Sequence, residues 1–343
     1  VGPHTVAAMV TDVADRLVID ADPLRIELLW RRMYSSGYAL RPDPTLVGIM
    51  SGIEMACWDI VGKDAGLPIS DLLGGRVHDR IRTYTYLYPT LDRPDVYADP
   101  AQAADQALFE VERGFTAVKF DPAGPYTAFD GHMPSRDDIA RSVALTRTVR
   151  EAVGDRADLL FGTHGQFTAA GAIRLARQLE PFDPLWFEEP TQPDLPAEMA
   201  RVARQTTIPI ATGERLTTIS EFAALAQHQS AAIWQPNLGR CGGISAAKKI
   251  AAIGEAAGCQ IAPHLYSGPI LGAANIQFGA TLPNLLIVEA IQDWSGFHAE
   301  LLTTPLDWQD GYVRPSREPG LGTELNEAVA LAHPYTPDPD DST

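Results

Sequence analysis

The sequence predicts an α/β fold, a TIM-like barrel in which strands and helices alternate. Five polar residues each end or directly follow a short apolar run, at intervals of 26, 23, 27 and 25 residues: Glu188, Glu214, Asn237, His264 and Glu289. Ala-rich stretches of helical composition lie between these runs. A strand, a helix and two turns need about 25 residues, which is the repeat of a βα barrel. Because the carboxyl ends of barrel strands meet at one mouth, we expect these side chains to gather there.

Eight barrel strands are expected in chain order. They are predicted at 81–87, 116–120, 158–161, 184–187, 208–213, 231–236, 260–263 and 285–288. Apolar residues at helical spacing predict helices over 3–33 and 46–65 ahead of the barrel, and over 99–113 and 137–153 within it. The pattern breaks up after Glu289, and residues 334–343 are expected to form an exposed tail.

One connection is longer than a barrel loop needs. Residues 121–136 follow the second strand and run to two or three times the usual length, with Gly, Pro and aromatic residues. The segment is either a loose insertion or a lid at the catalytic face. We favour the lid, because loops that follow barrel strands emerge at that face.

Composition narrows the class of protein. The chain has 27 basic and 44 acidic residues, a formal net charge of −17, which disfavours nucleic acid or an anionic membrane as a partner. No apolar run reaches the roughly 18 residues of a membrane span, and no signal-peptide pattern opens the chain. Three cysteines without metal-type spacing argue against a disulfide framework, so a reduced cytoplasm is expected.

Two glutamates on neighbouring strands suggest a metal. Glu188 and Glu214 follow strands four and five, and two carboxylates that close repel unless a proton or a cation intervenes. A hard divalent cation, most simply Mg²⁺, provides that charge and leaves room for substrate. The alternative is a pair of salt-bridged rim residues. The matching positions on adjacent strands favour the metal.

Other polar residues near strand ends are candidates for proton transfer and substrate binding. His264, opposite the carboxylate pair, is expected to be a general base, and His164 is a second acid/base candidate. Glu289 is placed to donate to an enolate oxygen if its pKa is raised. Lys119 directs a cation toward the mouth or pairs with a neighbouring acid. The weaker substrate-contact candidates are Arg215, His132 and Tyr126.

These residues belong to motifs that resemble a known family. The chain is similar to the enolase superfamily in its mandelate racemase/muconate lactonizing enzyme-like branch, and most closely to sugar-acid dehydratases of the galactonate dehydratase type. The resemblance covers nearly the whole chain. It rests on the segments 51–63, 67–68, 72–75, 186–190, 212–215, 235–237, 241–244, 262–264 and 319–322.

The resemblance implies an (α/β)₇β barrel with an α+β capping domain, and Mg²⁺ that holds the substrate carboxylate. A base removes the proton α to that carboxylate, and in the dehydratases a second group protonates the departing β-hydroxyl. Carried over by motif, Glu188 and Glu214 match metal ligands, and His264 matches the base. His164 matches the acid for the leaving group, and Glu289 matches the acid near the enolate.

Three positions depart from the family pattern. The family's Asp after strand three falls on Gly162, and either Asp121 or His164 replaces it as a ligand, unless the metal is lost; we favour Asp121. The Asp that orients the strand-seven histidine is Asn237, so His264 should be a weaker base or adopt the other tautomer. The chain begins at what resembles the first helix of the cap, so the opening β-meander is expected to be missing.

The sequence therefore predicts a metal-dependent sugar-acid dehydratase, with His264 as base and His164 as acid. The alternatives are a racemase, epimerase or cycloisomerase that uses the same enolate chemistry, and a catalytically silent relative that binds a small acid. The expected organisation is cap helices at 1–78, a barrel at 79–315, and a C-terminal segment at 316–343 that returns to the cap. A small anionic sugar acid and other copies of the chain are the expected partners.

Overall fold

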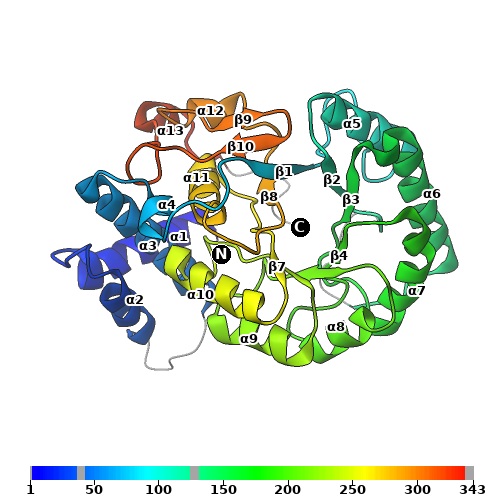
Figure 1. The fold of residues 1–343 in the computed structure, drawn as a ribbon, viewed down its shortest axis with the longest axis horizontal. Coiled ribbons are helices and arrows are strands. Elements are labelled where there is room, and N and C mark those ends of the chain that lie inside the picture. The colour runs from blue at the N-terminus through cyan, green and yellow to red at the C-terminus, as the bar shows by residue number, and fades with distance from the viewer. Residues whose placement is uncertain (1, 37–42, 124–130, 337–343) are drawn as a thin grey trace.

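Eight parallel strands form the centre of the molecule. The structure, a computed structural model, describes residues 2–36, 43–123 and 131–336. The strands are β1 (Ile81–Tyr86), β2 (Ala117–Phe120), β3 (Asp158–Phe161), β4 (Trp186–Glu188), β5 (Ile210–Thr212), β6 (Ile233–Trp234), β7 (Gln260–Ile261) and β8 (Val288–Ala290). They pair in chain order from β1 to β7, and β8 pairs with β1. Figure 1 shows this ring of strands with the helices outside it.

The ring closes between β7 and β8 through backbone hydrogen bonds. The Ile261 N–H donates to the Asn284 carbonyl at 2.9 Å, and the Leu286 N–H donates to the Ile261 carbonyl at 2.8 Å. One buried cluster takes one apolar residue from each strand or its approach and fills the interior: Tyr84, Ala117, Leu160, Trp186, Ala211, Ile233, Ala262 and Ile287. The predicted TIM-like barrel is confirmed, with a solid interior rather than a pore.

Helices follow the strands and pack around the ring. They are α5 (Pro100–Glu112), α6 (Arg136–Val153), α7 (Ala169–Leu179), α8 (Pro196–Ala203), α9 (Ile219–His228), α10 (Gly243–Ala256) and α11 (Pro269–Gly279). The helix after β8, α12 (Phe297–Glu300), has a single turn. The helices predicted at 99–113 and 137–153 match α5 and α6. Capping boxes at Ser135 and Thr218 fix where α6 and α9 begin.

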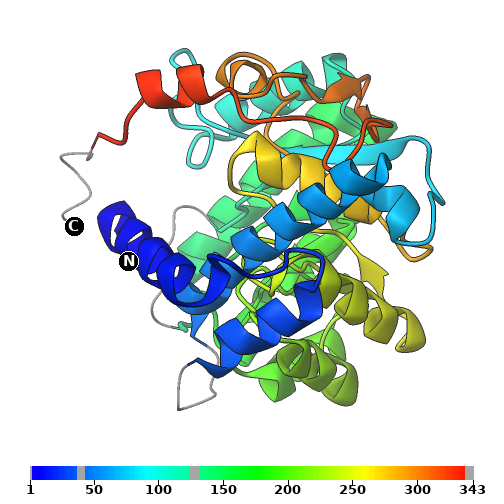
Figure 2. The ribbon, with the colours of Figure 1, turned by 90° about the vertical axis from the view of Figure 1, so that its left-hand side faces the viewer.

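The N-terminal helices form a cap on one side of the barrel (Figure 2). They are α1 (Pro3–Val13), which continues as a π-helix (Ala14–Val18), α2 (Ile26–Ser35), α3 (Pro44–Ala65) and α4 (Ile69–Leu72). The continuous helix predicted over 3–33 is wrong at 19–25. Asp20 has a left-handed φ of 65° there, and Pro23 disfavours helix at the residue before it. The prediction at 46–65 matches α3, which ends at Gly66 in the left-handed conformation.

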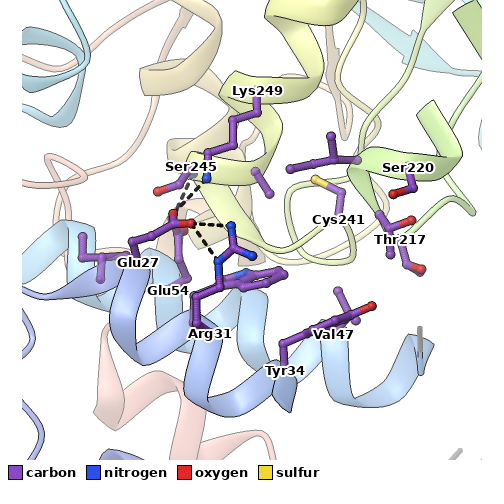
Figure 3. Close-up of a pocket in the computed structure, with 15 residues that line it drawn as sticks. Glu27, Arg31, Tyr34, Val47, Glu54, Thr217, Ser220, Cys241, Ser245 and Lys249 are labelled. Atoms are coloured by element: carbon purple, nitrogen blue, oxygen red, sulfur yellow. Dashed lines mark hydrogen bonds and ion pairs between the residues drawn. The ribbon is translucent and has the colours of Figure 1, made fainter. Parts of the chain in front are cut away.

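The cap is fixed to the barrel through the buried Glu54 on α3. Its carboxylate accepts from the N–H groups of Ile244 (2.7 Å) and Ser245 (2.9 Å) at the start of α10, and from the Trp58 indole N–H at 2.9 Å. These bonds satisfy donors that every helix N-terminus leaves open. A cavity of about 180 Å³ lies beside this contact, and Figure 3 shows Glu27, Arg31 and Lys249 at its edge.

The contacts of helix α3 identify it as the core helix of the cap. Among the described residues it alone has the length and apolar composition to span a membrane, a test that buried helices of globular proteins also pass. It packs against α1, α2 and α10. The three cysteines, Cys57, Cys241 and Cys259, are all free thiols, as their number predicted.

The C-terminal segment returns to the cap. The strands β9 (Asp307–Gln309) and β10 (Tyr312–Arg314) form an antiparallel hairpin that joins the start of β1, a feature the sequence did not predict. Beyond them, the Ile69 N–H donates to the Gly320 carbonyl at 3.0 Å, and the Leu321 N–H donates to Asp59 Oδ1 at 2.8 Å. Helix α13 (Glu327–Ala332) follows. Most of the predicted tail lies outside the described residues.

Candidate active site at the barrel mouth

A cavity of about 540 Å³ opens where the carboxyl ends of the strands meet. It is lined by Tyr86, Tyr88, Pro89, Tyr97, Lys119, Asp121, His164, Glu214, Arg240, His264, Tyr266 and Glu289. Six of these are residues that the sequence proposed for the site. Two more proposed residues, Glu188 and Asn237, are buried in direct contact with the lining. The polar residues that the sequence places at the strand ends therefore lie together at one mouth of the barrel.

An ammonium group lies among the carboxylates. Lys119 Nζ donates to Glu188 Oε1 at 2.7 Å and lies 3.7 Å from Glu289 Oε1. Burial acts to lower the pKa of Lys119, but the carboxylates of Glu188 and Glu289 outweigh it and raise that pKa well above its usual value. Lys119 is therefore a fixed cation of the site.

The other oxygen of Glu188 is also bonded. Trp186 Nε1 donates to Glu188 Oε2 at 3.1 Å, and Gln235 Nε2 donates to the same oxygen at 2.8 Å. Trp186 is the first residue of β4, and Gln235 directly follows β6. These bonds hold the Glu188 carboxylate in one orientation, with Oε1 toward Lys119.

Asp121 occupies space that a side chain on Gly162 would need. A Cβ atom built on Gly162 would lie 3.0 Å from Lys119 Cε, 3.0 Å from the Tyr86 hydroxyl oxygen and 3.3 Å from Asp121 Oδ1. Asp121 is 3% exposed, and its Oδ1 makes no hydrogen bond of ordinary geometry. Burial raises the pKa of Asp121 to about 7, although the nearby Tyr86 hydroxyl and Lys119 act to lower it.

Two imidazoles face opposite oxygens of Glu214. His264 Nε2 lies 3.1 Å from Glu214 Oε2, and His164 Nε2 lies 3.6 Å from Glu214 Oε1. Burial is the main cause that lowers the pKa of His264. Burial, followed by the charges of Lys119 and Arg215, lowers the pKa of His164 to about 2. Both rings are therefore neutral near pH 7.

An amide supports the imidazole of His264. Asn237 Nδ2 lies 2.9 Å from His264 Nδ1, and Asn237 Oδ1 accepts from the Gly239 N–H at 2.8 Å. His264 is buried, and its carbonyl oxygen accepts from Asn275 Nδ2 at 3.2 Å. Asn237 therefore holds the ring and Asn275 holds the backbone of His264, while Nε2 lies toward Glu214.

Comparisons with known proteins match the chain to a family. Residues 102–329 match the model of the enolase C-terminal domain-like family, and residues 1–74 match that of the mandelate racemase/muconate lactonizing enzyme N-terminal domain. The chain belongs to the mandelate racemase/muconate lactonizing enzyme family of the enolase superfamily.

Named relatives cover most of the chain. It is 37% identical to a D-galactonate dehydratase of Ralstonia nicotianae over 338 residues, 96% of this chain and 84% of the relative. It is 30% identical to a D-gluconate dehydratase of Thermoproteus tenax, over 92% of this chain and 62% of the relative. The solved mandelate racemase/muconate lactonizing enzyme from Jannaschia sp. CCS1 is 52% identical, with a TM-score of 0.94 and coverage of 98% and 87%.

Members of this superfamily generally use Mg²⁺, and the donors at the mouth suit such a cation. Four carboxylates, Asp121, Glu188, Glu214 and Glu289, lie at or beside the mouth, which Lys119 and Arg240 also line. Oδ1 of Asp121 and Oε2 of Glu214 are buried acceptors without a hydrogen bond, which is the oxygen chemistry a hard cation prefers. Among the described residues, no group of three or more acidic, His or Cys side chains is already gathered to hold a metal. The positive charge beside Glu188 is the ammonium group of Lys119.

Two proposed substrate contacts, Arg215 and His132, are not among the residues that line this cavity. Arg215 Nε donates to Glu189 Oε2 at 2.7 Å, so its guanidinium is held by a buried carboxylate. The His132 N–H donates to the Gln166 carbonyl at 3.1 Å, and its ring packs on Phe167. Tyr126, with residues 124–130 of the proposed lid, lies outside the described residues.

Sequence reasoning missed an aromatic rim around the mouth. Tyr86, Tyr88 and Tyr97 line it from the β1 side, and Tyr266 follows β7. The rings of Tyr88 and Tyr266 stack with centroids 6.5 Å apart. Arg240 was missed as well. A signal was present, because Tyr86 and Tyr88 lie at the end of the first strand and Tyr266 lies two residues after His264.

Proposed function

We propose that this protein is a hydro-lyase that removes water from a sugar acid, an aldonate or an aldarate, to give a 2-keto-3-deoxy acid. The observation that carries the proposal is the pair of neutral imidazoles, His164 and His264, on either side of Glu214 at one barrel mouth. Dehydration needs a proton taken from one carbon, a proton given to the hydroxyl of the next, and a hydrogen bond to the oxygen that becomes negative, and imidazoles can serve each of these roles. The likeness to proteins named D-galactonate and D-gluconate dehydratase supports the same chemistry.

The mouth has the groups that such a substrate requires. Its volume of about 540 Å³ is within the usual range for small-molecule sites. Lys119 and Arg240 supply positive charge for the substrate carboxylate. Glu289 lies on β8 with Oε2 bonded to the Leu265 N–H at 2.6 Å, which leaves Oε1 toward Lys119 and the cavity.

We propose that Mg²⁺ is the cofactor, held by Glu188, Glu214 and Asp121. Bound there, the cation would polarise the substrate carboxylate and make the neighbouring C–H bond more acidic. The surplus of carboxylates over cationic side chains supports a divalent cation. Asp121 is a better third ligand than His164, because Asp121 Oδ1 is the acceptor that occupies the space beside Gly162.

The test is an assay of aldonates and aldarates, with and without Mg²⁺, that detects 2-keto-3-deoxy acid. Product from at least one acid is the expected result. Exchange of the α-proton with solvent but no keto acid would indicate the racemase or epimerase alternative. Binding of an acid without exchange or product would indicate a silent relative. We also propose that the protein forms a homo-oligomer in a reduced cytoplasm and binds neither nucleic acid nor a membrane.

A further inference from the structure

The hydrogen bonds of Asn237 determine which nitrogen of His264 carries the proton. The Gly239 N–H donates to Asn237 Oδ1 at 2.8 Å. A backbone N–H can only donate, so the amide oxygen must face Gly239 and the amide NH₂ must face His264 Nδ1, 2.9 Å away. An NH₂ group has no lone pair to offer in return, so Nδ1 must be the acceptor. The proton of the neutral ring is therefore on Nε2.

The same contact disfavours a second proton on the ring. An Nδ1–H would point at the amide NH₂ of Asn237, and turning that amide over would leave the Gly239 N–H facing an NH₂ group. The hydrogen bonds of Asn237 therefore favour a neutral His264.

A neutral His264 ring with its proton on Nε2 can donate a hydrogen bond into the mouth but cannot accept a proton there. Nε2 is the nitrogen that faces the acidic side chains, 3.1 Å from Glu214 Oε2 and 3.9 Å from Glu289 Oε2. It has no lone pair with which to take a proton, and giving its proton away would leave an imidazolate. It can donate a hydrogen bond to an oxygen that becomes negative, and such donors stabilise enolates effectively.

We propose that His264 acts as a neutral hydrogen-bond donor to the enediolate oxygen, and that Asn237 is the positioning residue that sets this tautomer. The proposal rests on the dehydratase function proposed above. It replaces the base role that the sequence suggested for His264. The amide at position 237 then matters for function, because an aspartate there would accept a hydrogen bond from Nδ1–H and leave the lone pair on Nε2.

Both proton transfers then fall to His164. The α C–H bond breaks, the proton passes to the neutral His164, and the electron pair moves into the enediolate. As the Cα=Cβ bond forms, the β C–O bond breaks, and the departing hydroxide takes that same proton from His164 and leaves as water. The enol then becomes the 2-keto-3-deoxy acid.

The tautomer can be measured without substrate, by ¹⁵N NMR of the histidine side chains in the full-length protein. Comparison with His264→Gln identifies the His264 signals. We expect a protonated Nε2 and a bare Nδ1 in the wild type, and the reverse in Asn237→Asp. A wild-type ring with its proton on Nδ1 would overturn the proposal. Because no sugar acid is needed, this result stands whether or not dehydratase activity is found.

Activity separates a hydrogen-bond donor from a base. Glutamine keeps an N–H donor and leucine does not, so His264→Gln should retain kcat to within about tenfold while His264→Leu loses about 10²–10³-fold. His164→Gln should abolish exchange of the α-proton with solvent. If His264→Gln and His264→Leu are equally inactive and His164→Gln still exchanges the proton, His264 is the base and the proposal is wrong.

Discussion

The carboxylate of Asp121 lies where a side chain on Gly162 would begin, with Oδ1 3.3 Å from the position of that Cβ atom. The two residues are neighbours across β2 and β3, because Phe120 pairs with Phe161 and the Gly162 N–H donates to the Phe120 carbonyl at 2.9 Å. We propose that Asp121 supplies the carboxylate that position 162 lacks. The relationship suggests that the two positions are interchangeable as carriers of one carboxylate.

Exchange of the two residues should conserve metal binding. Asp121→Asn should weaken Mg²⁺ binding by at least about tenfold, because it removes one charged oxygen ligand of three. The double variant Gly162→Asp, Asp121→Asn should recover most of that loss, since Gly162 has no left-handed φ and a side chain there requires only small shifts. Isothermal titration calorimetry with Mg²⁺ alone measures the affinity of the single and of the double variant. Wild-type affinity in Asp121→Asn would exclude Asp121 as a ligand.

Asp121 should also make stability depend on pH in EDTA. Its pKa is raised from 3.8 to about 7 in the folded protein, so the folded state holds a proton that the unfolded state has lost. That contribution to stability is complete below about pH 4 and is lost as the pH rises through about 7, with a slope of at most about 1.4 kcal/mol per pH unit.

Asp121→Asn removes that group, so its free energy of unfolding should rise relative to the wild type between pH 4 and 7 and then level off. Urea unfolding at a series of pH values measures the difference. Parallel curves for the two proteins would show that Asp121 ionises normally.

A close contact between α3 and the C-terminal segment should not tolerate a methyl group. A Cβ on Gly62 would lie 2.6 Å from Gly320 Cα and 2.9 Å from the Leu67 carbonyl oxygen. Gly62→Ala should therefore destabilise the protein by about 1–3 kcal/mol. The control is Gly52→Ala in the same helix, where a Cβ meets nothing within 4 Å, and which should stabilise by up to about 1 kcal/mol. Equal urea midpoints for the two variants would contradict this packing.

The buried carboxylate of Glu54 should contribute far more to stability than an exposed one. Both of its oxygens accept hydrogen bonds, so Glu54→Gln places an NH₂ group against at least one N–H donor. The expected loss is about 1–3 kcal/mol in urea unfolding. The control is Glu27→Gln at the edge of the same junction, where the ion pairs with Arg31 and Lys249 are exposed and should contribute less than about 1 kcal/mol. A similar loss in both variants would rule out a special role for Glu54.

The interval between polar strand ends was sufficient to predict the barrel and its mouth. Each interval spans one strand and one helix, so Glu188, Glu214, His264 and Glu289 had to arrive at one end of a closed sheet. The β9–β10 hairpin was missed, since its pairing with Ile81 and Arg82 depends on residues more than 200 positions away. Pro23 is a signal in the sequence that the helix is interrupted. The apolar residues at helical spacing on either side of it nevertheless predicted helix across this position.

The sequence by itself determined the fold, the family, the gathering of acids and histidines, and the two unusual positions, Gly162 and Asn237. All of these follow from residue type and spacing along one chain. Only the tertiary structure decided what those two positions do, because their effects depend on atoms from other strands. Asp121 Oδ1 lies 3.3 Å from the point where a side chain on Gly162 would begin, and the Gly239 N–H turns the amide of Asn237 toward His264. Distances of about 3 Å between side chains on neighbouring strands have no signature in the sequence.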